Sequence, residues 1–187
     1  IVNLSGVLGL DALDGDIAEL LRCIRSAGAL TCLDMIYNTA ADAPAIVHSA
    51  LEHVDCFAPS LEEAQLVAGT EALSAADMAR MFCDRGCGVA VVKQGAEGCF
   101  LCSGGGEVLH IPACTPGQVL DATGAGDAWV GGFLTGLLRG EDAVRSAQLG
   151  NAAASFCIEA PGTTAGIPAL DQVLARRAAA PEPRPAA

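Results

Sequence analysis

The sequence predicts an α/β protein built on a mostly parallel, doubly wound sheet, and three observations carry this prediction. First, short apolar runs typical of buried strands alternate with amphipathic segments at helical spacing. Second, polar side chains follow several of the strand-like runs, where ligands bind in such sheets. Third, the 187-residue chain is 52% apolar, which suffices for one sizeable core, and it shows no internal repeat or interdomain linker.

The individual elements follow from local patterns. We expect strands at residues 2–6, 29–34, 54–59, 88–93, 99–102 and 108–112. Helical spacing predicts helices at residues 16–27, 43–51, 61–69, 75–85, 128–138, 141–158 and 169–177. Ser60 followed by Glu63 has the pattern of a capping box. We expect one domain over residues 1–177 and a disordered tail over the Ala-, Pro- and Arg-rich residues 178–187.

Charge and hydropathy exclude some classes of function. The net charge is −12 and Lys93 is the single lysine, which argues against binding to a nucleic-acid backbone. No apolar run approaches the ~20 residues that a membrane-spanning helix needs. The first residues have no Met and no basic stretch, so we expect no signal peptide and a strand entered in the middle of a fold. This pattern favours a fragment of a longer protein.

Nine cysteines are scattered through apolar segments. An odd number of such residues favours buried, reduced thiols and a cytoplasmic location. Cys83-x3-Cys87 and Cys99-x2-Cys102 allow a zinc site as an alternative. Their irregular spacing and strand-like surroundings favour the structural interpretation.

Residues 121–127 (DATGAGD) form the most informative segment, because they lead directly into an apolar helix. Small residues before a helix N-terminus create an anion site, where free N–H groups and the helix dipole favour negative charge. A carboxylate at this place, Asp127, needs a separate reason. Removing the proton from a hydroxyl that attacks a phosphoryl group would supply one. The P-loop and dinucleotide-binding motifs are both missing from the sequence.

At these residues the chain resembles the PfkB (ribokinase-like) sugar kinases. Residues 121–128 with 131–133 are similar to the C-terminal signature of that family, and the similarity continues in register elsewhere. Matching segments are 59–64 with Gly69, 91–98, 151–154 and 161–168. The resemblance covers most of residues 1–173.

The resemblance implies a three-layer α/β/α sandwich, of which the N-terminal part and the β lid are missing here. It also implies ATP-dependent phosphorylation of a sugar or related small alcohol. By this resemblance Asp127 is the base for the acceptor hydroxyl. The backbone N–H groups of Gly124, Ala125 and Gly126 form the anion hole for the transferred phosphoryl group.

Nucleotide and metal contacts are implied in the same way. Glu63 acts through water on Mg²⁺, and Ser60, Lys93, Gly95 and Gly98 contact the nucleotide, with Asn151 near the adenine. Some family members also hold a monovalent cation such as K⁺. Its implied ligands here are Asp121 and Thr123, with the backbone of Cys157, Ala160, Gly162 and Gly166. A homodimer of the full-length protein is also compatible with the resemblance.

Departures from the family pattern leave an alternative function. Ser60 stands where Asn is usual, so its nucleotide contact is shorter or mediated by water. Residues 34–38 (DMIYN) replace the common Asp-Pro-Asn-x-Arg run. Together with the missing N-terminal part, these differences favour a truncated, non-catalytic nucleotide-binding or interaction module as the alternative.

Several site residues also have plain structural interpretations. Glu63 could serve only the capping box, Asp34 could be a solvated strand end and Lys93 a surface residue. The Trp129 and Phe133 side chains, four residues apart, are expected in the core.

Overall fold

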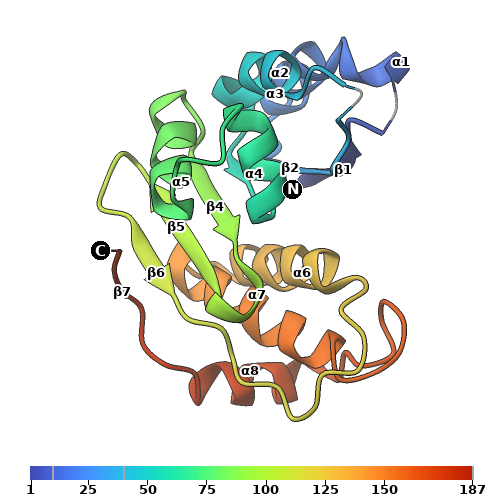
Figure 1. Cartoon of the computed structure of the whole chain (residues 1–187), viewed down its shortest axis with the longest axis vertical. Helices are drawn as coiled ribbons and strands as arrows, with labels where there is room; N and C mark the ends of the chain where they lie inside the picture. Colours follow the sequence, from blue (N-terminus) through green and yellow to red (C-terminus); the bar gives the residue numbers. More distant parts are fainter. Residues whose placement is uncertain (10, 40, 187) are drawn as a thin grey trace. The chain divides into compact units, whose positions relative to one another are not determined.

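The computed structural model describes residues 1–9, 11–39 and 41–186, which divide into two compact units. Unit 1 comprises Ile1–Lys93, Phe100–Val108 and Ala186, and unit 2 comprises Gln94–Cys99 and Leu109–Pro185. In unit 1 the strands follow one another in sequence order, β1 to β5, in the sheet (Figure 1). Each unit carries its own group of candidate site residues.

Parallel strands form the centre of unit 1. They are β1 (Val2–Val7), β2 (Thr31–Met35), β3 (Cys56–Phe57) and β4 (Val89–Lys93), each paired in parallel with the next. In the register, Leu4 lies opposite Leu33 and Cys56 opposite Val89. β2 is buried along its whole length, as expected for a parallel strand inside an α/β fold. β5 (Cys99–Ser103) continues the sheet order after β4.

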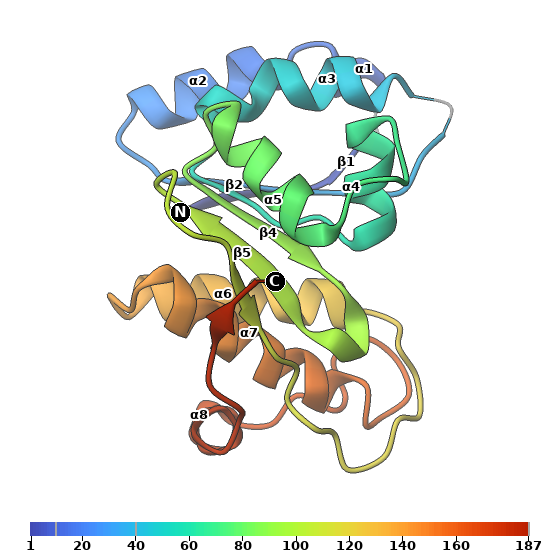
Figure 2. The same cartoon turned by 60° about the vertical axis from the view of Figure 1, so that its left-hand side comes forward.

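The helices of unit 1 connect these strands. They are α1 (Asp11–Asp14), α2 (Ile17–Ser26), α3 (Ala43–Ala50), α4 (Leu61–Ala68) and α5 (Ala75–Asp84), with a 3₁₀ turn, η1 (Leu51–His53). α2 to α5 lie on one face of the strands (Figure 2). Right-handed crossovers that add each strand on the same side place their helices on the same face. Phe57 of β3 packs edge-to-face on Phe82 of α5, with ring centroids 5.0 Å apart.

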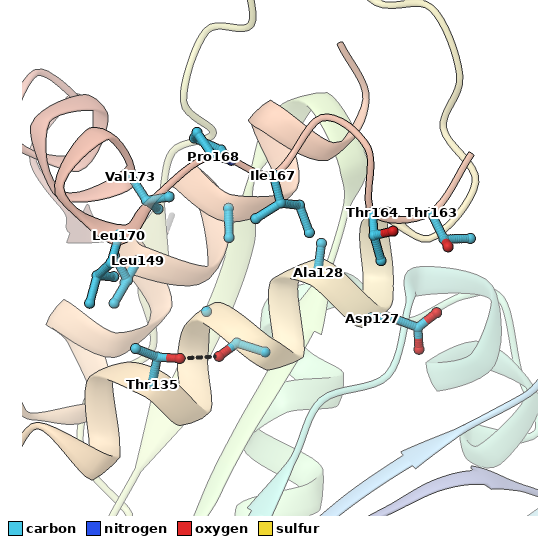
Figure 3. Close-up of a pocket in the computed structure, with 13 residues that line it drawn as sticks. Asp127, Ala128, Thr135, Leu149, Thr163, Thr164, Ile167, Pro168, Leu170 and Val173 are labelled. Carbon is cyan, nitrogen blue, oxygen red and sulfur yellow. Dashed lines mark hydrogen bonds between the residues drawn. The ribbon is translucent and has the colours of Figure 1, made fainter. Parts of the chain in front are cut away.

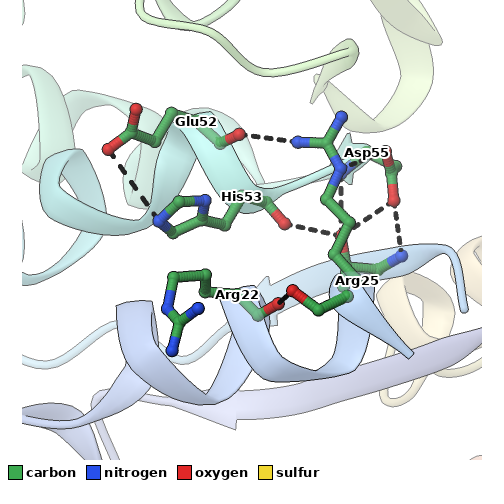
Figure 4. Close-up of polar contacts among 7 residues, drawn as sticks. Arg22, Arg25, Glu52, His53 and Asp55 are labelled. Atoms are coloured by element: carbon green, nitrogen blue, oxygen red, sulfur yellow. Dashed lines mark hydrogen bonds and ion pairs between the residues drawn. The ribbon is translucent and has the colours of Figure 1, made fainter. Parts of the chain in front are cut away.

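A polar network ties the amino ends of these strands together (Figure 4). Asp55 Oδ2 accepts hydrogen bonds from the Thr31 backbone N at 2.8 Å and the Thr31 hydroxyl at 3.0 Å. Arg25 of α2 donates to the Glu52 carbonyl at 2.7 Å, and its Nε lies 3.4 Å from Asp55 Oδ1. The network therefore stabilises the end of unit 1 opposite to the carboxyl ends of β2 and β4.

Unit 2 is mainly helical. It contains η2 (Gly95–Glu97), β6 (Leu109–Ile111), α6 (Ala125–Leu138), α7 (Ala143–Cys157), α8 (Leu170–Ala178) and β7 (Arg184–Pro185). α6 and α7 pack very closely, because glycines face the contact. A Cβ on Gly132 would lie 2.8 Å from the Leu149 carbonyl oxygen, and a Cβ on Gly150 would lie 2.8 Å from that of Trp129.

The aromatic pair of α6 confirms its expected place in the core. The rings of Trp129 and Phe133 stack with centroids 5.2 Å apart, and both side chains are buried. Within the described residues no helix has the length and apolar character needed to cross a membrane.

Two features differ from the sequence-based expectations. Composition suggested a disordered tail, but β7 pairs antiparallel with β6, and Arg184 Nε donates to His110 Nδ1 at 3.3 Å. The pairing partner lies about 70 positions earlier, so no local pattern reveals it. The short helix α1 was also not expected.

Candidate active site

The α6 N-terminus carries the central residues of the site in unit 2. Gly124 is the N-cap and has φ 78°, a left-handed conformation that glycine adopts without strain. A Cβ at this position would lie 2.8 Å from both Cα and Cβ of Thr163, so only glycine fits. The Ala125 N–H donates to the Ala122 carbonyl at 3.2 Å, and Ala128 N to Gly124 O makes the first α-helical bond. The Gly126 and Asp127 N–H groups lie ahead of that bond, at the positive end of the helix dipole.

The Asp121 side chain forms hydrogen bonds that join the loop before α6 to the segment that follows α7. Its Oδ1 accepts from the Thr123 backbone N and its Oδ2 from the Gly162 backbone N, both at 2.9 Å. Hydrogen bonds from Thr123 and then from Gly162 lower the Asp121 pKa to about 2. The carboxylate is therefore charged at neutral pH and holds the two loops together.

Cys157 lies between the same two loops. Its buried Sγ is 3.2 Å from the Thr163 carbonyl oxygen and 3.6 Å from that of Thr123. Burial is the main cause that raises the pKa of this thiol, followed by the charges of Asp121 and Asp127. A neutral thiol that donates to a carbonyl is a structural group rather than a nucleophile.

Most residues of the suggested monovalent-cation site meet at this place. Asp121, Thr123, Cys157 and Gly162 are joined by the contacts above, and a Cβ on Gly166 would lie 3.0 Å from the Cys157 carbonyl oxygen. Each Asp121 oxygen already accepts one N–H, and a carboxylate oxygen has room for a second partner. These contacts come from N–H and S–H donors and hold the two loops together.

A pocket of about 610 Å³ opens beside Asp127 (Figure 3). Asp127, Thr163 and Thr164 lie together at one end, and the remainder is mainly apolar. The other lining residues are Ala128, Gly131, Gly132, Thr135, Leu149, Ala153, Ile167, Pro168, Leu170 and Val173. An apolar cavity with a few polar groups at one end is typical of sites for small molecules and cofactors.

In unit 1, the polar residues predicted at the carboxyl ends of the strands do lie together. Lys93 Nζ at the end of β4 is 3.4 Å from Asp34 Oδ1 in β2, and both side chains are largely buried. The backbone of Ser60 forms an isolated parallel β-bridge with that of Lys93, so the start of α4 lies beside the end of β4. The structural interpretations of Asp34 as a solvated strand end and of Lys93 as a surface residue are therefore wrong.

Glu63 forms the expected capping box of α4. Its Oε2 accepts from the Ser60 backbone N at 2.7 Å, and its own backbone N donates to Ser60 Oγ at 3.3 Å. Burial nevertheless raises the Glu63 pKa, although the Ser60 bonds and Lys93 act in the opposite direction. Because burial disfavours the charged form of this carboxyl group, a cation close to it would stabilise that form.

The remaining predicted nucleotide residues, Gly95, Gly98 and Asn151, lie in unit 2. Gly95 and Gly98 lie at the two ends of the η2 turn, and a Cβ on Gly98 would clash with the Ile111 carbonyl oxygen. The Asn151 amide is buried, accepts from Trp129 Nε1 at 2.7 Å and donates to the Ile111 and Pro112 carbonyls. The Asn151 side chain thus joins α6, α7 and the end of β6.

The cysteines make contacts of a structural kind. Cys83 Sγ donates to the Cys102 carbonyl at 3.2 Å and Cys87 Sγ to that of Val89 at 3.1 Å. Among the residues that the structure describes, no group of three or more His, Cys, Asp or Glu side chains is placed to hold a metal ion.

Sequence reasoning did not single out the apolar walls of the pocket. Leu149, Ala153, Leu170 and Val173 are ordinary apolar positions of α7 and α8 in the sequence. Leu149, Ala153 and Val173 are buried and Leu170 is 38% exposed, and this difference is known only from the structure.

Comparison with known proteins assigns this chain to a family. The pattern described as pfkB family carbohydrate kinase matches residues 1–170, and the chain belongs to this family of kinases. The sequence resemblance to PfkB kinases is thereby confirmed.

Individual relatives agree with this assignment. The chain is 36% identical over 118 residues to an uncharacterized sugar kinase of Archaeoglobus fulgidus, a match that covers 63% of this chain and 45% of the relative. A putative ribokinase II from E. coli, solved in complex with ATP and Mg²⁺, has a TM-score of 0.78 at 23% identity and covers 93% and 57% of the two chains. The ribokinase of Arabidopsis thaliana, solved with ribose and ATP, gives 0.75 at 22% identity, covering 88% and 52%.

These structural likenesses confirm the ribokinase-like α/β fold expected from the sequence. The chain spans about half the length of the relatives it matches.

Proposed function

We propose that the polypeptide carrying this chain transfers the γ-phosphoryl group of ATP to a hydroxyl of a sugar or related small alcohol. The observation that carries the proposal is the position of Asp127, on the first turn of α6 and at the polar end of the 610 Å³ pocket. A carboxylate beside free backbone N–H groups suits a reaction in which a hydroxyl loses its proton as negative charge develops nearby.

The chain's own groups have separate roles in this proposal. Asp127 accepts the proton of the acceptor hydroxyl. The backbone of Gly124–Gly126, with the Gly126 N–H ahead of the first helical bond, stabilises charge on the transferred group. Asp121 and Gly162 hold this loop in place through their 2.9 Å hydrogen bond. We assign Gly95 and Gly98 to the nucleotide, with Asn151 near the adenine.

Mg²⁺, when bound, neutralises charge on the nucleotide phosphates. Glu63 is the residue we assign to it, acting through water, with Ser60 and Lys93 near the phosphates. The raised Glu63 pKa supports this assignment, because a buried carboxylate is stabilised by a cation. We assign K⁺, where it is used, to Asp121 and the carbonyls around it.

A sugar acceptor is supported by family membership and by the ribose found in the Arabidopsis relative. The test is equilibrium binding of ATP with Mg²⁺, followed by release of ADP in the presence of a panel of sugars and nucleosides. We expect binding in the range of about 1 μM to 1 mM and ADP release that depends on one acceptor class. ATP binding without turnover on any acceptor would instead support the non-catalytic module.

A further inference from the structure

The η2 turn has little internal structure to fix its conformation. It lies between Gly95 and Gly98, whose φ angles of 53° and 90° are positive and therefore suit glycine. Within the turn, the Gly98 N–H donates to the Gly95 carbonyl at 3.0 Å, and the Gln94 N–H donates to the Gly98 carbonyl at 2.8 Å. A short 3₁₀ turn with glycine at both ends needs contacts from other segments to keep one conformation.

The His110 side chain of β6 makes such a contact. Its Nε2 lies 2.7 Å from the carbonyl oxygen of Glu97, the last residue of η2. The His110 ring is only 8% exposed, so water competes little for this hydrogen bond. Because a carbonyl oxygen can only accept a hydrogen bond, Nε2 must carry a proton.

Arg184 of the C-terminal strand β7 contacts the other nitrogen of the same ring. Arg184 lies opposite His110 in the antiparallel register of β6 and β7, and its Nε donates to His110 Nδ1 at 3.3 Å. Because a guanidinium can only donate, Nδ1 must be without a proton. The contacts with Glu97 and Arg184 therefore require the same form of the ring, a neutral imidazole with its proton on Nε2.

Asn151 holds the backbone that follows His110. Its amide donates to the Ile111 carbonyl at 3.1 Å and to the Pro112 carbonyl at 2.8 Å, while its oxygen accepts from Trp129 Nε1 at 2.7 Å. These three hydrogen bonds fix the end of β6 on α6 and α7. The His110 ring therefore projects from a strand that is itself held in place.

We infer that His110 is a positioning residue of the nucleotide site. Its Nε2–H holds η2 so that Gly95 and Gly98 can contact the nucleotide, and Arg184 selects the ring form that this hydrogen bond requires. The inference rests on the proposed function, which assigns η2 to the nucleotide. It gives the last strand of the chain a part in nucleotide binding, because Arg184 acts on η2 through the His110 ring.

The test compares the dissociation constants of ATP with Mg²⁺ for His110→Met and His110→Gln in the full polypeptide that carries this chain. Methionine removes the donor and should raise the dissociation constant by about fivefold or more, as expected from one lost hydrogen bond. Glutamine offers an amide N–H in place of Nε2–H and should keep the affinity. His53→Met, at a histidine of the unit 1 network in Figure 4, is the matched control and should leave ATP binding unchanged.

In turnover, His110→Met should raise the KM for ATP and leave kcat unchanged, because the residue touches no reacting atom. Equal ATP affinity of the unsubstituted protein and of folded His110→Met would overturn the inference and leave the proposed function intact. An equal loss of affinity in His110→Gln and His110→Met would also overturn it. Failure of the unsubstituted protein to bind ATP would overturn the proposed function as well. Urea unfolding verifies that each variant is folded.

Nitrogen NMR of the His110 ring tests the inference without a variant of His110, and so applies even if His110→Met does not fold. We expect the proton on Nε2 in the unsubstituted protein and a mixture of the two tautomers in Arg184→Met. A proton on Nδ1 in the unsubstituted protein, or the same tautomer in Arg184→Met, would overturn the part that the inference gives to Arg184.

Discussion

The guanidinium of Arg176 in α8 forms a two-point ion pair with the Glu159 carboxylate, with Nη1–Oε1 at 2.8 Å and Nη2–Oε2 at 3.3 Å. The Arg176 guanidinium also lies over the Phe156 ring, 3.2 Å from its centroid. The same Glu159 accepts from the Gly117 backbone N at 2.6 Å. This relationship joins α8, a wall of the pocket, to the end of α7 and to the chain that leads toward Asp121.

Arg176→Met should therefore destabilise unit 2. Paired charge-assisted hydrogen bonds and the ring contact together suggest a loss of about 2 kcal/mol in the free energy of unfolding, measured in urea. Arg22→Met is the matched control, because the Arg22–Glu19 pair is more than half exposed and its loss should leave the free energy of unfolding almost unchanged. Equal effects of the two substitutions would contradict the importance of the Arg176 contacts.

Two neighbouring glycines of α6 should respond oppositely to alanine. At Gly132 a Cβ would lie 2.8 Å from the Leu149 carbonyl oxygen and 2.9 Å from the Ala153 Cβ, whereas at Gly131 it meets no atom within 4 Å. We expect Gly132→Ala to destabilise by about 1–3 kcal/mol through overpacking. Gly131→Ala should stabilise by about 0.5–1 kcal/mol through helix propensity. Thermal unfolding of both variants measures the difference, and the same sign for both would refute the close packing of α6 on α7.

Substitutions of Glu63 separate its capping role from a role with Mg²⁺. Glutamine can still accept from the Ser60 N–H, and burial disfavours the charged form of Glu63, so Glu63→Gln should be neutral or slightly stabilising at pH 7. Glu63→Ala loses the cap and should cost about 1 kcal/mol. If Glu63 serves Mg²⁺, both variants should need more Mg²⁺ for ATP binding. Unchanged Mg²⁺ dependence in Glu63→Gln would leave the residue only its capping role.

The Asp121 carboxyl group should titrate at a lower pH than an ordinary aspartate. Its folded pKa of about 2 is below the ordinary value of 3.8, so its contribution to stability is fully present above pH ~4 and is lost as pH falls through 2. The carboxyl carbon shift in an NMR titration measures this value. A midpoint near 3.8 would mean that the hydrogen bonds to Thr123 and Gly162 do not form in solution.

Local patterns were sufficient for much of the fold and for part of the site. Ser60 and Glu63 predict the start of α4 because a capping box joins residues only three positions apart. The glycines before Asp127 predict the start of α6 in the same local way. Non-local contacts were not predictable. Arg184 bonds to His110, and the Asn151 amide bonds to the Ile111 carbonyl. Both contacts join segments that are distant in the sequence, so no local pattern predicts them.

Asp127 tests the central claim most directly. Asp127→Asn preserves the shape of the side chain and removes its ability to accept a proton. In the full polypeptide that carries this chain, the account predicts a loss of about 10²–10⁴-fold in the rate of sugar phosphorylation, with the dissociation constant for ATP unchanged. Phosphorylation at the unsubstituted rate in Asp127→Asn would contradict the account.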